Sequence, residues 1–198
     1  MHRIVLAAAL SIMFVGCSSQ PAEVPAAGTS AAQPAPGPVS PPTSDEEMTA
    51  SAMSAAPEAV ASAATIITMD EKMQVRTLRQ GTNGWTCMPD VPSSPGADPM
   101  CVDKNGMEWA QAWMGHKDPP AGKMGFGYML MGGSDASNED PFATKPTEGQ
   151  AWVDTGAHVM IFNIGDQFEG YPTTHENAKA PYVMWSNTPY RHLMIPVK

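Results

Sequence analysis

The chain has 198 residues, of which 20 are acidic and 11 are basic, giving a formal net charge of −9. This acidic surplus argues against nucleic acid as a partner, because phosphates are bound by a basic surface. It argues equally against a charged face that attracts anionic lipid, so any attachment to a membrane must have another cause.

The N-terminus has the features of an export signal. Arg3 supplies a positive charge and residues 4–15 are apolar. About a dozen apolar residues fit a signal peptide, whereas a membrane-spanning helix needs about 20. The tetrapeptide Phe-Val-Gly-Cys that ends at Cys17 resembles the lipobox of bacterial lipoproteins, which are cleaved before an acylated cysteine. Phe14 departs from the pattern, since that family usually has an aliphatic residue there.

This resemblance implies a location and an anchor. Residues 1–16 are then a signal peptide and Cys17 carries the lipid. In lipoproteins an Asp after the cysteine commonly retains the protein at the inner membrane, so Ser18 favours the outer membrane, facing the periplasm. The alternative is an ordinary secretory signal that is cut near Ala26 or Ala27.

A linker is predicted after the lipidated cysteine. Residues 18–44 are rich in Pro, Ala, Ser, Gly and Thr and have one charged side chain, Glu23. This composition favours extended polyproline II, because too few large apolar residues are present to offset the entropy of folding. The sequence therefore divides into residues 1–16, a disordered tether over 17–44 and a folded domain over 45–198.

The domain combines helical and strand patterns. Helices are predicted over 45–56, with Ser44 as the N-cap, over 57–64, and from Asp103, as the N-cap, to about His116. Asn83-Gly84 predicts a tight turn, and 132–149 is expected to be a long polar loop. Strands are predicted over 65–69, 73–78, 85–87, 124–131, 152–153, 159–164, 182–185 and 192–197. These elements predict a single α+β domain with two or three helices and a mainly antiparallel sheet.

Two cysteines remain besides Cys17. Cys87 and Cys101 flank a segment rich in Pro, Gly and Ser, and an even pair in an exported chain predicts a disulfide. A redox-active pair is the alternative, but such cysteines are normally separated by two residues. A metal site is less favoured, because neither cysteine has a close cysteine or histidine neighbour in the sequence.

A short motif occurs twice in predicted strands. His158 precedes Met160 by two residues, and His192 precedes Met194 by two. Alternate residues of a strand share a face, so each histidine points to the same side as its methionine. If the two strands are neighbours in register, the four side chains could converge on a copper ion, since imidazole and thioether suit Cu(I). The alternative is that the intervening aliphatic residues form the core and that His and Met line the other face.

Other candidate sites are weaker. Oxygen donors cluster over residues 134–140, but the spacing lacks the pattern of a calcium-binding loop and also fits Asx-turns. Trp109 and Trp113 lie one helical turn apart, which fits a core face better than a platform for a sugar. No catalytic motif of the common hydrolases, metalloproteases or nucleotide-binding enzymes occurs.

Segments 81–90, 98–101 and 192–196 resemble an uncharacterised family of bacterial secreted proteins, over most of residues 60–198. The resemblance implies no activity. We therefore expect a lipid-anchored envelope protein whose domain binds a small ligand or an envelope protein without catalysis. A copper-binding protein that uses His158, Met160, His192 and Met194 is the second hypothesis, and an enzyme is the third.

Overall fold

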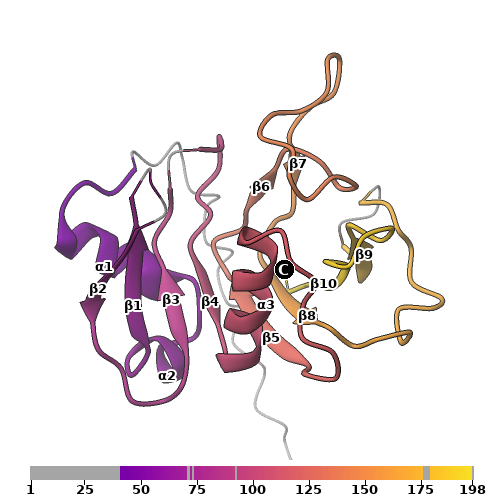
Figure 1. Cartoon of the computed structure of the whole chain (residues 1–198). Helices are drawn as coiled ribbons and strands as arrows, with labels where there is room; N and C mark the ends of the chain where they lie inside the picture. Colours follow the sequence, from indigo (N-terminus) through magenta and orange to yellow (C-terminus); the bar gives the residue numbers. More distant parts are fainter. Residues whose placement is uncertain (1–40, 71, 73, 92, 176–178, 198) are drawn as a thin grey trace, which may run out of the picture. The chain divides into compact units, whose positions relative to one another are not determined.

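A computed structural model describes residues 41–70, 72, 74–91, 93–175 and 179–197, and Figure 1 traces their path. The predictions for residues 1–16, for Cys17 and for the linker up to residue 40 lie outside the described residues.

The described residues confirm the α+β class, with three helices and a mainly antiparallel sheet. The helices are α1 (Asp45–Ser54), α2 (Glu58–Ala61) and α3 (Lys104–Met114). The strands are β1 (Thr65–Met69), β2 (Val75–Arg79), β3 (Thr86–Met88), β4 (Met100–Val102), β5 (Gly125–Met129), β6 (Ser134–Asp135), β7 (Val153–Asp154), β8 (His158–Phe162), β9 (Tyr182–Met184) and β10 (His192–Pro196).

Eight of these strands form one sheet in the order β2-β1-β3-β4-β5-β8-β10-β9. Only β1 and β3 run parallel, and the other neighbouring pairs are antiparallel. The remaining two strands, β6 and β7, pair separately as a short second sheet. The sheet order places β8 and β10 side by side although β9 lies between them in the sequence.

Both long helices begin where the sequence predicts. The side chain of Ser44 accepts from the backbone N–H of Glu47, whose carboxylate accepts from Ser44 in return, so a complete capping box starts α1. Asp103 caps α3 by accepting from the N–H of Gly106 at 2.7 Å. These caps satisfy N–H groups that have no partner within their own helix.

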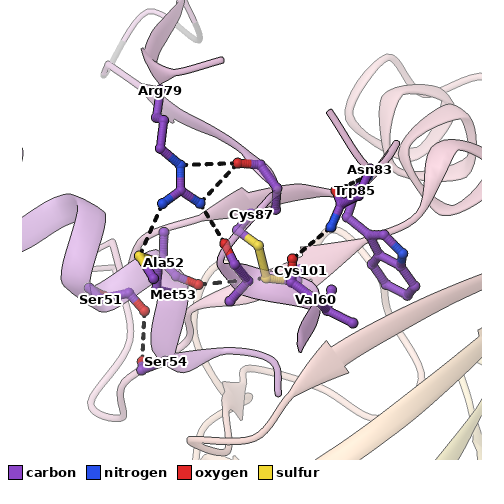
Figure 2. The surroundings of a disulfide bond; sticks show 12 residues. Ser51, Ala52, Met53, Ser54, Val60, Arg79, Asn83, Trp85, Cys87 and Cys101 are labelled. Atoms are coloured by element: carbon purple, nitrogen blue, oxygen red, sulfur yellow. Dashed lines mark hydrogen bonds between the residues drawn. A yellow bond between two sulfur atoms is a disulfide. The ribbon is translucent and has the colours of Figure 1, made fainter. Parts of the chain in front are cut away.

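One face of the sheet packs against α1 and α2 through small side chains. Ala52, Ala55, Ala61 and Ala64 are buried there with Ile66 and the Cys87–Cys101 disulfide. Cys87 and Cys101 lie directly opposite each other on β3 and β4, which confirms the predicted bridge. Figure 2 shows Arg79 near this bridge. The guanidinium of Arg79 donates to the backbone carbonyls of Ala61 and Ala64, near the end of α2.

The other face of the sheet packs against α3 and holds the larger core. Trp109 of α3 stacks on Phe162 of β8 with ring centroids 4.4 Å apart. Methionines and aromatic residues make up most of this core, with Met160, Met184 and Met194 all buried. Gly125 of β5 permits the close approach of α3, because a Cβ there would lie 2.4 Å from the backbone nitrogen of Gly106.

Two details differ from the sequence prediction. The segment 132–149 is not entirely loop, because β6 lies within it and pairs with β7. Strand β4 was not predicted, although it joins β3 to β5. Both strands are only two or three residues long, so a pattern that relies on alternation cannot distinguish them from a loop.

Candidate functional site

The two His-x-Met motifs lie on neighbouring antiparallel strands in register. Met160 of β8 is directly opposite Met194 of β10, and all four motif residues are at most 4% exposed. The four side chains line a single cavity of about 330 Å³, which we call the His/Met cavity. The sequence-based hypothesis of a shared site required the two strands to be neighbours in register, and β8 and β10 are such neighbours.

The aliphatic residues between them do form a core, but a smaller one. Leu193 and Val183 are buried on the opposite face with Phe168, and Ile161 and Ile195 pack against them. Along β8 it is the His and Met positions that are buried, while Val159 and Ile161 are half-buried. The alternative interpretation thus holds in part: the aliphatic residues form a core and the His and Met side chains line the other face, but that other face carries the larger core.

The two imidazoles are held in the same way. Nδ1 of His158 lies 2.7 Å from the carbonyl oxygen of Gly156, and Nδ1 of His192 lies 3.0 Å from that of Tyr190. Because a carbonyl oxygen only accepts, each Nδ1 must carry the proton, which leaves a lone pair on each Nε2 of the neutral ring. Within the described part of the chain, neither Nε2 has a hydrogen-bond partner.

Burial keeps both rings neutral. It lowers the pKa of His158, and it lowers the pKa of His192 to about 4, with a further contribution from the charge of His158. A proton therefore does not compete for either Nε2 lone pair at neutral pH. A backbone carbonyl that fixes the tautomer in this way is typical of histidines that bind metals.

Three further methionines line the cavity: Met100 of β4, Met129 of β5 and Met184 of β9. Met129 lies directly opposite His158, and Met184 lies directly opposite His192. None of these three methionines was predicted from the sequence to be a site residue. Met129 and Met184 fall within predicted strands, but only the strand order shows that they face the histidines.

Space for the methionines comes from a glycine. Gly127 of β5 is directly opposite Met160, and a Cβ there would lie 2.8 Å from Cε of Met160 and 3.0 Å from the ring of Phe162. A side chain on residue 127 would therefore push Met160 aside. Gly125 and Gly127 face the same side of β5, and the absence of side chains there lets α3 and Met160 approach the strand closely.

Aromatic rings wall the cavity. Trp109 and Trp113 of α3 pack against Trp185, and the rings of Trp109 and Trp185 also meet His192 edge-on at 5.3 and 5.0 Å. Nε1 of Trp113 donates to the carbonyl of Pro141 at 2.9 Å. Both α3 tryptophans thus belong to the aromatic core, as the sequence favoured.

Carboxylates lie at another part of the lining. Asp135 of β6 and Asp98 are half-buried there, and the N–H of Ser134 donates to Asp98 at 2.6 Å. Burial, together with the neighbouring Asp98, raises the pKa of Asp135 to about 7, and burial also raises the pKa of Asp98. A cation that entered the cavity would relieve this repulsion between the two carboxylates.

The other two histidines in the described residues, His116 and His175, lie elsewhere. His116 is exposed and stacks on Phe142 with centroids 4.0 Å apart, and His175 is also exposed. Neither lines the His/Met cavity.

The remaining oxygen donors are used locally. In the segment proposed for calcium, Oγ of Ser137 accepts from the N–H groups of Glu139 and Asp140, which are local turn contacts. Within the described ranges, no three His, Cys, Asp or Glu side chains are grouped so that they could hold a metal ion. A metal in the His/Met cavity would therefore depend on methionine sulfur.

No protein-family model, curated protein or solved structure matches this chain. The resemblances to bacterial lipoproteins and to a secreted family therefore stay predictions. No helix in the described part of the chain has the length and apolar character needed to cross a membrane.

Proposed function

We propose that the domain is a non-catalytic ligand-binding domain and that its ligand is a soft metal ion, Cu(I), bound in the His/Met cavity. One observation carries the proposal: the two His-x-Met motifs lie on adjacent strands in register, and all four buried side chains line one cavity.

The donor atoms favour Cu(I) over harder ions. Thioether sulfur and neutral imidazole are soft or borderline ligands, whereas calcium and magnesium need oxygen. Both Nε2 lone pairs are available because each Nδ1 is bound to a backbone carbonyl. Asp98 and Asp135 line the same cavity, and a cation that binds there favours their charged carboxylate forms.

Binding is a better hypothesis than catalysis for these histidines. Each Nδ1 contacts a backbone carbonyl, and in the part of the chain that the structure describes neither ring contacts a carboxylate. A general base usually needs such a partner to stabilise its protonated form, and the low pKa of His192 opposes protonation. The predicted lipid anchor on Cys17 would hold the copper-binding domain in the cell envelope.

Copper titration of the full chain in mild detergent tests the proposal. The assay uses anaerobic buffer with ascorbate and a chromophoric Cu(I) chelator that competes for the ion. We expect the parent protein to remove Cu(I) from the chelator. The double variant His158→Asn/His192→Asn should bind Cu(I) at least tenfold more weakly, since losing even an outer-shell partner of a metal ligand costs about 10- to 100-fold and losing the ligand itself costs no less.

Asparagine suits this test because its amide can still donate to the carbonyl that each imidazole contacts, while the Nε2 ligand is lost. The exposed His116→Asn/His175→Asn variant is the matched control and should bind as the parent does. Equal competition by the parent and the His158→Asn/His192→Asn variant, with both proteins folded, would reject copper binding in this cavity.

A further inference from the structure

We infer that the His/Met cavity binds two Cu(I) ions, one at His158, Met129 and Met160 and the other at His192, Met184 and Met194. This inference rests on the proposed function and adds the number of ions and the ligands of each.

The register separates the two histidines. His158 lies opposite Pro196, and His192 lies opposite Phe162, so the histidines are four residues apart along the strand direction. At about 3.3 Å per residue this is roughly 13 Å along the backbone. Two nitrogens bound to one ion lie within about 4 Å of each other. One shared ion would therefore require both rings to lean strongly toward the centre.

Each histidine instead has its own pair of methionines. His158 has Met129 directly opposite on β5 and Met160 two residues along β8. His192 has Met184 directly opposite on β9 and Met194 two residues along β10. All six side chains line the cavity.

The two sets are related by an approximate two-fold arrangement. In each set a histidine is flanked by one methionine on a neighbouring strand and one on its own strand. Met160 and Met194, the methionines on the histidine strands, lie directly opposite each other at the centre. Both imidazoles also use Nδ1 for a carbonyl two residues earlier in the chain. Each set thus offers one nitrogen and two sulfur atoms, a soft three-ligand set suited to Cu(I).

The cavity can accommodate this arrangement. Its volume of about 330 Å³ exceeds the space that one ion needs. The positive charge of two monovalent ions is opposed by Asp98 and Asp135 in the same lining. Met100 also reaches the cavity and is not needed by either set.

The number of ions bound tests the inference. We expect the full chain in detergent to bind two Cu(I) ions in the competition assay. His158→Asn and His192→Asn should each bind one, as should the milder Met129→Leu and Met184→Leu when assayed near the parent affinity. Met124→Leu changes an exposed methionine and is the control that should still bind two.

X-ray absorption at the copper edge gives an independent readout. Two separate sites predict one nitrogen and two sulfur neighbours per copper, whereas one shared site predicts two nitrogens. Saturation of the parent at one ion, or loss of all copper in either single histidine variant, would overturn the inference while leaving copper binding intact. A parent that binds no copper would reject the proposed function itself.

Discussion

His158 and His192 are buried polar residues, each with one fixed nitrogen. Each imidazole satisfies its Nδ1–H by donating to a backbone carbonyl, at 2.7 and 3.0 Å. A buried histidine that is neutral in the folded state destabilises the protein in acid, because the unfolded state takes up a proton that the folded state refuses. Two buried histidines that stay neutral in the folded state therefore make the fold sensitive to acid.

His192 allows this sensitivity to be measured. Its pKa falls from the ordinary value of 6.5 to about 4, so its contribution to the free energy of unfolding is complete above pH 6.5 and is lost as the pH falls toward 4. At pH 5 we expect a loss of roughly 2 kcal/mol relative to pH 7. His192→Asn should lack this loss.

Urea unfolding of the parent and His192→Asn at pH 7 and pH 5 provides the measurement. Asp135 acts in the opposite sense, since its pKa is raised to about 7 and its contribution declines as the pH rises from about 4 to 7. Asp135 is present in both proteins, so the difference between them isolates His192. The same pH dependence in both proteins would contradict this assignment.

The sequence predicted some of the site at this scale. The alternation of a strand was enough to place His158 with Met160 and His192 with Met194 on shared faces. It could not identify Met129 or Met184, because each is a single methionine whose partner is 29 or 8 residues away in the chain. Asp135 was considered only as part of the oxygen-rich segment 134–140, because a strand of two residues gives no pattern that would place it in the lining of the same cavity as the histidines.

At the scale of elements, the sheet has two chemically different faces. Cys87 and Cys101 alternate along β3 and β4 with Met88 and Met100, so the disulfide faces α1 while the methionines face the other side. The structural bridge and the His/Met cavity are thus on opposite faces of the same strands. Stability and binding should be separable by mutation.

Removal of the disulfide tests this separation. Cys87→Ala/Cys101→Ala opens a bridge between residues 14 apart in sequence, and the expected loss of stability is about 3 kcal/mol for a loop of this length. Urea unfolding under non-reducing conditions measures the loss. The copper affinity of the folded variant should stay within about twofold of the parent, because the disulfide and the proposed copper ligands lie on opposite faces of the sheet. A large loss of affinity with little loss of stability would contradict the separation.

The helices and long strands could be predicted because their signals are local. Ser44 and Asp103 cap their helices as expected, and β8 and β10 lie within or beside their predicted ranges. The order of the strands could not be predicted. β8 pairs with β5 and β10, not with its neighbour in sequence, and these pairings depend on tertiary packing that no local pattern records.

For the whole molecule, the predicted anchor, if present, would determine where the domain works. Cys17 lies outside the described residues, and its role depends on the resemblance to a lipobox. A tether over residues 17–44, if extended, could place the domain on the order of 80 Å from the membrane surface. The domain would then reach copper or a partner protein well away from the bilayer.

Cys17→Ser tests the anchor in cells. A serine cannot be acylated through a thioether, so the variant should lose lipid labelling and leave the membrane fraction or remain unprocessed. The domain itself should keep its fold, measured as an unchanged unfolding midpoint. A variant that is processed and membrane-bound exactly like the parent would favour the ordinary secretory signal instead.

The aromatic wall has an optical consequence. Four of the five tryptophans, Trp109, Trp113, Trp152 and Trp185, line the same cavity as the proposed ligands. The fifth, Trp85, packs on Tyr128 with the disulfide cluster on the other side of the sheet. A copper ion bound in the cavity would quench the fluorescence of these four tryptophans, while Trp85 would continue to fluoresce. The tryptophan fluorescence of the unmodified protein would thus report whether the cavity is occupied, and Trp85 on the opposite face would serve as an internal reference.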